Sequence, residues 1–282
     1  MRLIFLTLVV MLAFAGNSLL NRLAVGSGEI GAMGFALIRL AAGAVMLLAL
    51  CRARQQSIVQ PVRLSLIGGG SLALYMIGFS LAYRSLDAGL GALILFGVVQ
   101  ITMFGWGAAR GAVVAPGQLL GAALAFGGLA YVLWPAGEVQ VPLIGAGFMV
   151  AAGLGWAIYS LLGRQVQSPF AATAMNFIWA SVIVLPLVWF LAEPIAISVL
   201  GAGLAIVSGA VTSGLGYALW YRVLPQLQPA VAATVQLSVP VIAMLVGVAG
   251  LGEVLSLRLL LGTLAVLGGI ALVIVAAPGK PR

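Results

Sequence analysis

The chain has 282 residues, of which 63% are hydrophobic and 6% are charged. A soluble domain carries about 25% charged residues, so this composition indicates an integral membrane protein. The net charge is +8, but the basic residues are scattered singly and form no cluster of the kind that binds nucleic-acid phosphates. One cysteine and no histidine exclude an intramolecular disulfide, a histidine-ligated metal and a histidine-activated nucleophile, so we expect no metal, no cofactor and no enzymatic activity.

Ten apolar segments follow one another along the chain once it is cut at charges, prolines and polar clusters. A membrane-spanning helix needs roughly 20 mostly apolar residues, and each segment meets that requirement. In chain order the segments are 3–23, 31–51, 64–83, 88–109, 117–134, 143–163, 170–191, 199–221, 230–250 and 259–277. This pattern predicts an all-α integral membrane protein with ten transmembrane helices.

The basic residues fall mainly on one side of these ten segments. The side of the N-terminus holds Arg2, Arg52, Arg54, Arg63, Arg110, Arg164, Arg222, Lys280 and Arg282. The opposite side holds Arg22, Arg84 and Arg258, together with Glu29, Asp87, Glu138, Glu193 and Glu253. Because cytoplasmic connections are enriched in Lys and Arg, this predicts a multi-pass protein of the plasma (inner) membrane with both termini in the cytoplasm.

Three stretches of the first half recur in the same order in the second half. "SLLNR" at 18–22 returns as "SLLGR" at 160–164, "YRSL" at 83–86 as "YRVL" at 221–224, and "LLGAALAFGG" from Leu119 as "LLGTLAVLGG" from Leu260. Ordered matches at nearly constant spacing are not expected from composition alone. We therefore divide the chain into repeats 1–138 and 139–282. Since each repeat holds five helices, the second enters from the opposite side, which is the inverted repeat of many transporters.

The second half carries a family resemblance. Its stretch "YALWYRVLPQLQPAVAATVQLSVPVIAMLVGVAGLGEVLSLRLLLGTLAVLGGIALVI" resembles an EamA-type repeat of the drug/metabolite transporter superfamily. The first half fits more loosely, because Val99 stands in the place of Pro240 and Ala112 in the place of Glu253. The resemblance implies a ten-helix basket around a central cavity lined mainly by helices 1, 3, 4, 6, 8 and 9. Within the superfamily, the chain most resembles the YddG-type exporters of aromatic amino acids.

Two matching stripes of hydroxyl and aromatic side chains occur in the third and eighth segments. At four-residue intervals they are Ser71, Tyr75, Phe79 and Tyr83, and Gly209, Ser213, Tyr217 and Tyr221. Such stripes suit a flat apolar ligand with a polar end. We assign Tyr75, Phe79, Ser213 and Tyr217 to substrate binding, whereas Tyr83 and Tyr221 are expected to belong to the aromatic belt at the membrane surface.

Further candidates for substrate binding lie in the other helices that, according to the resemblance, line the cavity. Trp156 and Tyr159 in the sixth segment and Phe96 in the fourth supply rings. Asn17 and Gln100 are amides in apolar surroundings and need hydrogen-bond partners there. Contact with the ligand and a structural bond between helices are both open for these two amides.

The ninth segment contains a proline in its middle. Pro240 has no N–H, so the carbonyl of Gln236 loses its helical partner. That carbonyl and the Gln236 side chain could together accept hydrogen bonds from an ammonium group, with Pro240 as a hinge. The alternative is a simple kink in which a neighbouring hydroxyl fills the gap.

Arg39 is the only charged residue well inside a segment, about 12 Å from its outer end. A charge within the membrane is a functional candidate, and Arg39 could meet a solute carboxylate. The second helix does not line the cavity in the resembled fold, however. A structural role, in which Arg39 satisfies carbonyls of a loop or helix end, is therefore favoured.

These patterns together predict a transporter that uses alternating access. The five carboxylates lie at helix ends or in connections and there is no histidine, so the core lacks an evident proton carrier. We expect a monomer that exports small metabolites, amino acids including aromatic ones, without proton coupling, and whose only other partner is membrane lipid. The alternatives are a nucleotide-sugar, sugar-phosphate or drug carrier of the same fold, although phosphorylated solutes would require more basic residues than Arg39. A non-transporting membrane scaffold is least favoured.

Overall fold

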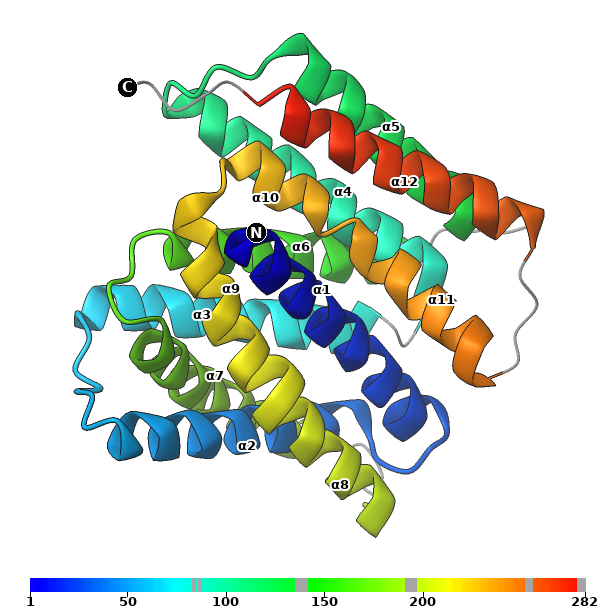
Figure 1. Ribbon diagram of the computed structural model, residues 1–282. Coiled ribbons are helices and arrows are strands. Elements are labelled where there is room, and N and C mark those ends of the chain that lie inside the picture. Colours follow the sequence, from blue (N-terminus) through cyan, green and yellow to red (C-terminus); the bar gives the residue numbers. More distant parts are fainter. Residues whose placement is uncertain (83–84, 86–87, 135–141, 191–196, 252–255, 278–282) are drawn as a thin grey trace. The chain divides into compact units, whose positions relative to one another are not determined.

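The computed structural model describes residues 1–82, 85, 88–134, 142–190, 197–251 and 256–277. The regular structure in these ranges is helical, and ten segments are long and apolar enough to cross a membrane (Figure 1). At most ends they agree to within a few residues with the segments predicted from the sequence. The predicted all-α fold with ten membrane-spanning helices is confirmed.

Most spans are single helices. They are α2 (Ala32–Ala53), α3 (Val62–Ala82), α4 (Ala88–Ala109), α5 (Pro116–Leu133), α6 (Leu143–Gly163), α7 (Pro169–Phe190) and α12 (Leu257–Val275). Several begin at residues that favour a helix start. Pro116 opens α5, where its missing N–H costs nothing. Ser256 caps α12, because its hydroxyl accepts a hydrogen bond from the N–H of Leu259 at 3.1 Å.

Three spans are composite. The first joins α1 (Arg2–Asn21) to a short π-helix, η1 (Arg22–Gly26). The eighth runs through α8 (Val199–Val207), a longer π-helix η2 (Ser208–Leu215), α9 (Gly216–Val223) and the 3-10 helix η3 (Leu224–Gln226). The ninth consists of α10 (Pro229–Val235) and α11 (Ser238–Leu251). The eighth span thus continues beyond the predicted end at residue 221, because Arg222 is exposed and does not interrupt the helix.

The helices fall into two compact units that do not follow the two sequence repeats. The first unit comprises Met1–Leu81 and Ile158–Gln226, and the second comprises Ala82–Ala157 and Leu227–Arg282. Each unit therefore combines helices from both repeats. The expected repeat boundary, between residues 138 and 139, lies outside the described residues, so the division into 1–138 and 139–282 stays a prediction.

Close helix packing in the first unit depends on small residues. There α2 packs against α7 and η2, and α1 packs against η2 and α9. A Cβ atom added at Gly209 would overlap the backbone carbonyl of Arg39, and one added at Gly43 would overlap the Phe177 ring. The absence of side chains at Gly43 and Gly209 therefore lets α2 approach η2 backbone to backbone.

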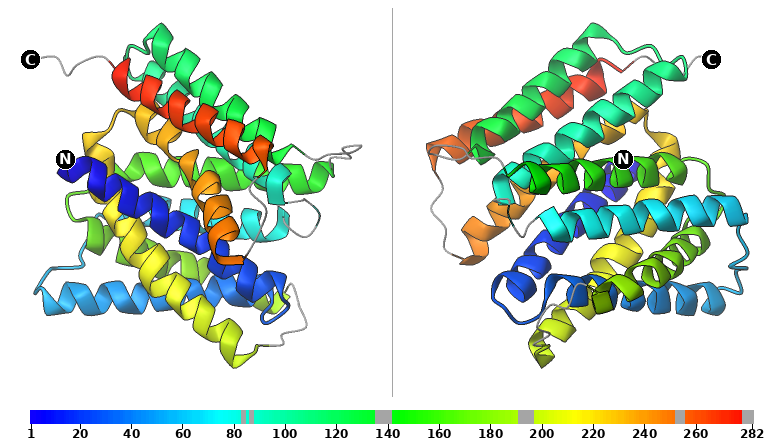
Figure 2. Two further views of the ribbon diagram at one scale, coloured as in Figure 1. Left: turned by 45° about the vertical axis from the view of Figure 1, so that its right-hand side comes forward. Right: turned by 180° about the vertical axis from the view of Figure 1, so that it is seen from behind.

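In the second unit, α5 and α12 lie side by side along most of their length (Figures 1 and 2). A Cβ atom at Gly121 would lie 2.7 Å from the carbonyl oxygen of Gly269, and one at Gly128 would lie 2.6 Å from the Cβ atom of Ala265. Glycines of the "GxxxG" and "GG" patterns thus permit this close approach. Gly127 and Gly268 take no part in it, since nothing lies within 4 Å of a Cβ atom built there.

Two threonines of the second unit differ in hydrogen bonding and give a first prediction. The Thr263 hydroxyl is buried and has no partner among the described residues. The Thr234 hydroxyl donates to the carbonyl of Ala230 at 2.9 Å and accepts from Gln100 at 3.5 Å. Because a buried unpaired hydroxyl is costly, Thr263→Val is expected to raise the free energy of unfolding by up to about 1 kcal/mol, and Thr234→Val to lower it by about 1 kcal/mol.

Cys51 offers a direct measurement of these effects. It is the single cysteine and is fully buried, so a thiol-reactive dye reports thermal unfolding in detergent. Equal losses of stability in both valine variants would contradict the assignment of the unpaired hydroxyl to Thr263.

Candidate functional site

A cluster of buried polar side chains lies within the spans of the first unit, where α1 meets η2. The Asn17 Oδ1 atom accepts hydrogen bonds from the hydroxyls of Ser208 at 2.8 Å, Thr212 at 2.5 Å and Ser213 at 2.9 Å. In a π-helix hydrogen bonds join residues five apart, so Ser208 and Ser213 face the same side. The four-residue stripe predicted from the sequence is interrupted here, because Gly209 packs against the backbone of Arg39 instead.

Arg39 extends this cluster from the side of α2. Its Nε atom donates to the Ser213 hydroxyl at 2.6 Å and its Nη2 atom donates to the Tyr217 hydroxyl at 2.7 Å. Only 3% of the Arg39 surface is exposed. The sequence predicts a structural role in which Arg39 satisfies carbonyls of a loop or helix end. Its partners among the described residues are instead side-chain hydroxyls of the eighth span, so the prediction of carbonyl partners is wrong for this part of the chain, while the structural role stays a prediction.

Aromatic rings surround the Tyr217 side chain in the same unit. The ring centroid of Tyr217 lies 5.4 Å from that of Phe14, 5.7 Å from that of Phe177 and 5.9 Å from that of Tyr159. The contacts with Phe14 and Phe177 are edge-to-face, a favourable geometry for aromatic pairs. The half-buried Tyr75 and Phe79 rings of α3 form a further pair at 5.5 Å.

Tyr221 is not the membrane-surface residue that its position in the sequence predicted. It is fully buried, donates its hydroxyl hydrogen to the carbonyl of Tyr159 at 3.0 Å and accepts from Asn176 at 3.1 Å. A belt residue would face lipid. The belt assignment is therefore wrong for Tyr221, and Tyr83 lies outside the described residues.

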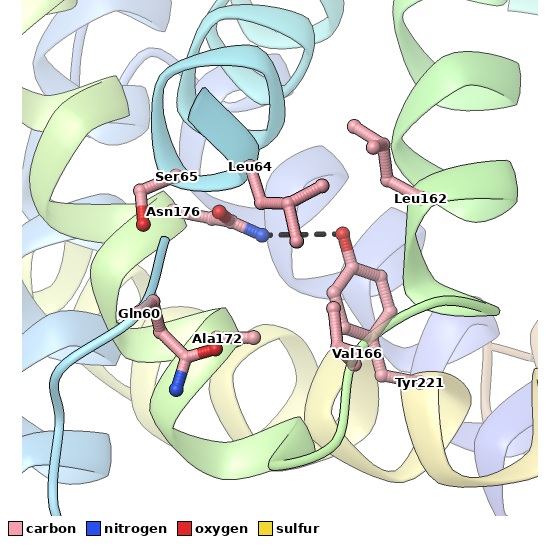
Figure 3. A pocket seen from close by; sticks show the side chains of 8 residues that line it. All are labelled: Gln60, Leu64, Ser65, Leu162, Val166, Ala172, Asn176 and Tyr221. Carbon is pink, nitrogen blue, oxygen red and sulfur yellow. Dashed lines mark hydrogen bonds between the residues drawn. The ribbon is translucent and has the colours of Figure 1, made fainter. Parts of the chain in front are cut away.

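A small pocket of the first unit contains the bond between Asn176 and Tyr221 (Figure 3). Its lining residues are Gln60, Leu64, Ser65, Leu162, Val166, Ala172, Asn176 and Tyr221. It has room for about one water molecule. The pocket is therefore too small for an amino acid in the conformation described.

The second copy of the repeated pentapeptide serves packing in the first unit. The Ser160 hydroxyl accepts a hydrogen bond from Trp220 Nε1 at 3.2 Å. Arg164 donates to the carbonyl of Leu224 at 2.9 Å, and partial burial lowers the pKa of its guanidinium. "SLLGR" thus joins α6 to α9 and η3.

The second unit contains a separate group of buried polar residues. Gln236 accepts a hydrogen bond from Trp156 Nε1 at 2.6 Å and donates to the carbonyl of Ala232 at 2.8 Å. Gln100 donates to the Thr234 hydroxyl at 3.5 Å. Phe96 packs, partly buried, against the hydrophobic core of this unit.

At the break between α10 and α11, the backbone carbonyls do not lack hydrogen-bond donors as the sequence suggested. The N–H of Val239 donates to the carbonyl of Gln236 at 3.0 Å, and the Ser238 hydroxyl donates to that of Val235 at 2.7 Å. A short turn thus gives the Gln236 carbonyl a backbone donor, so the carbonyl is not left without a partner as the sequence suggested. Its contact with an ammonium group stays a prediction. The alternative, a simple kink filled by a hydroxyl, fits only in part, because the hydroxyl of Ser238 bonds to the carbonyl of Val235 and not to that of Gln236. Motion about Pro240 stays a prediction.

The predicted site residues therefore belong to two groups. In the first unit they are Asn17, Tyr75, Phe79, Tyr159, Ser213 and Tyr217, with Arg39, and in the second they are Phe96, Gln100, Trp156 and Gln236. Polar residues that the sequence analysis missed are Ser208, Thr212 and Asn176 in the first unit and Thr234 in the second. Their position inside apolar segments is a signal that could have found them. No group of potential metal ligands occurs among the described residues.

Comparison with known proteins extends this description. Residues 143–275 match the model of the EamA-like transporter family. The uncharacterized protein PA1977 of Pseudomonas aeruginosa is 45% identical over 279 residues, which are 99% of this chain and 96% of that protein. The uncharacterized transporter YwfM of Bacillus subtilis is 30% identical over 148 residues, 51% of this chain and 50% of that protein.

A protein of known crystal structure shares the fold. It superposes with a TM-score of 0.86, with 98% of this chain and 97% of that chain covered, at 16% sequence identity. With its ten membrane-spanning helices and these relatives, the chain belongs to the EamA-like transporter family and is a membrane transporter.

Proposed function

We propose that the protein exports amino acids, including aromatic ones, across the inner membrane by alternating access. The main support is the buried cluster of Asn17, Ser213, Arg39 and Tyr217 within apolar spans. Polar groups inside a membrane are costly and mark solute pathways. A scaffold without transport activity would have no need of them.

The composition of the cluster favours an aromatic zwitterion as the solute. Hydroxyl and amide groups suit the polar end of such a solute, and the rings of Phe14, Tyr159 and Phe177 beside Tyr217 suit an aromatic side chain. The resemblance of the sequence to YddG-type exporters points in the same direction. Amino acids are therefore the solutes to test first.

Transport by this cluster would not need a proton. The chain has no histidine, and Glu29, the acidic residue of the described part, lies in the connection between two spans. Asp87, Glu138, Glu193 and Glu253 lie outside the described residues, where the sequence predicts helix ends or connections. A solute gradient is then the driving force.

The sequence also supports a proposal for the orientation of the protein in the membrane and for its oligomeric state. The excess of basic residues on the side of the N-terminus favours cytoplasmic termini. The internal duplication supplies two halves in one chain, which favours a monomer.

The test is uptake of labelled phenylalanine, tryptophan and threonine by liposomes that contain the purified protein. We expect saturable uptake of the aromatic solutes that is unchanged when a pH gradient is removed. Ser213→Ala removes the hydroxyl that holds the Arg39 Nε atom, so we expect it to lower uptake about tenfold, the effect of one lost charge-assisted hydrogen bond. Gln236→Leu removes two buried hydrogen bonds and should also lower uptake.

Two matched variants serve as controls. Ser27→Ala and Gln226→Leu change exposed side chains outside both polar groups, so uptake should remain at the wild-type level. Absence of uptake of all three solutes would reject amino acid export. Uptake that requires the pH gradient would reject the uncoupled mechanism.

A further inference from the structure

We infer that Arg39 binds the carboxylate of the transported solute and that the Tyr217 hydroxyl occupies the guanidinium when no solute is bound. This inference rests on the proposed function, since it presupposes that the solute is an amino acid. It assigns the recognition of the carboxylate to α2, a helix that the family resemblance did not place at the cavity.

The first argument is that Arg39 is a buried cation whose partners among the described residues are all neutral. It makes two hydrogen bonds among the described residues, and both acceptors are hydroxyl oxygens. Arginine has five N–H donors and stays charged at all physiological pH values. A buried charge that lacks a counterion is strongly unfavourable. A solute carboxylate would supply the missing negative charge.

The second argument is that the neighbouring groups complement an amino acid carboxylate. A carboxylate accepts two parallel hydrogen bonds from a guanidinium, and each is about twice as strong as a neutral hydrogen bond. It can therefore displace the Tyr217 hydroxyl, a neutral acceptor of a single hydrogen bond from the Arg39 Nη2 atom. Ser213 remains bonded to both Arg39 and Asn17, so the guanidinium stays in position during the exchange.

The third argument is the place of the rings. The Tyr217 ring lies 6.0 Å from the centre of the Arg39 guanidinium and contacts the rings of Phe14, Tyr159 and Phe177. When the solute displaces the hydroxyl of Tyr217, its aromatic side chain can contact the same rings. Arg39 thus recognises the carboxylate of the solute, and the neighbouring aromatic rings recognise its side chain.

The experiment measures how well unlabelled compounds compete with labelled phenylalanine for transport into liposomes. Phenylalaninamide keeps the ring and the ammonium group but replaces the carboxylate by a neutral amide. We expect the wild-type protein to bind phenylalanine at least tenfold more tightly than phenylalaninamide. Equal competition by the two compounds would overturn the role of the carboxylate, whereas absence of phenylalanine transport would reject the proposed function itself.

Variants then test whether Arg39 is the cause. Arg39→Gln should bring the ratio of the two affinities close to one, and Arg39→Lys, which keeps the charge but loses the paired geometry, should give an intermediate ratio. Arg222→Gln removes an exposed arginine of the same unit and should keep the wild-type ratio. If Arg39→Gln does not fold, the ratio of the two affinities in Arg39→Lys is sufficient to test the inference. A wild-type ratio in Arg39→Lys would show that Arg39 only holds helices together.

Discussion

Gly209→Ala is expected to separate α2 from η2 and to lower the free energy of unfolding by about 2–3 kcal/mol. The added methyl group would overlap the backbone carbonyl of Arg39. A backbone cannot turn aside as a flexible side chain can, so the helix axes must move apart. The hydrogen bonds of Arg39 to Ser213 and Tyr217 cross this contact and should weaken as well.

Gly203→Ala in α8 is the matched control for this prediction. Nothing lies within 4 Å of a Cβ atom built at Gly203. Because alanine favours a helix over glycine by about 1 kcal/mol, this variant should be as stable as the wild type or slightly more stable. Labelling of Cys51 during heating measures both variants, and α2 itself carries Cys51. Equal stability of the two variants would contradict the close approach of α2 and η2.

The ten spans could be predicted from the sequence because hydropathy is a local property. A run of about 20 apolar residues must form a helix in lipid whatever it packs against. The difference at the end of the eighth span has a simple cause. A charge at the end of an apolar run predicts the end of the span, but Arg222 lies exposed on the surface of a helix that continues to Gln226.

The candidate site could be predicted only in part, because its geometry depends on contacts between distant residues. The α-helical period of the sequence predicts Ser213 and Tyr217 as site residues. The sequence did not reveal that η2 is a π-helix, in which Ser208 joins Ser213 on one face and Asn17 accepts from both.

Tyr221 and Gln236 illustrate the same limit. Tyr221 lies near the end of an apolar run, a position that favours the membrane surface. Its hydrogen bonds to Tyr159 and Asn176, which belong to other helices, keep its side chain buried instead. For Gln236, the lost helical bond was predictable from Pro240. The replacement bond from Val239 depends on the turn that forms there.

Asn17→Leu is expected to lower the free energy of unfolding by about 3 kcal/mol. The side chain is nearly fully buried, and its amide oxygen accepts from three hydroxyls of η2. Leucine has a similar volume but no acceptor. Each buried hydroxyl that is left unsatisfied costs about 1–3 kcal/mol. The cost is smaller for the Thr212 hydroxyl, because it can still donate to the carbonyl of Ser208 at 3.1 Å.

Asn21→Leu is the matched control, since it makes the same substitution in the same helix, at a residue whose side chain makes no capping hydrogen bond. A double-mutant cycle identifies the bond responsible. Ser208→Ala should destabilise the wild-type protein by about 1 kcal/mol more than it destabilises Asn17→Leu, because the hydroxyl has already lost its acceptor in the variant. Independent effects of the two substitutions would contradict the bond. Because Asn17 also fixes Ser213, the partner of Arg39, Asn17→Leu should weaken competition by phenylalanine more than competition by phenylalaninamide.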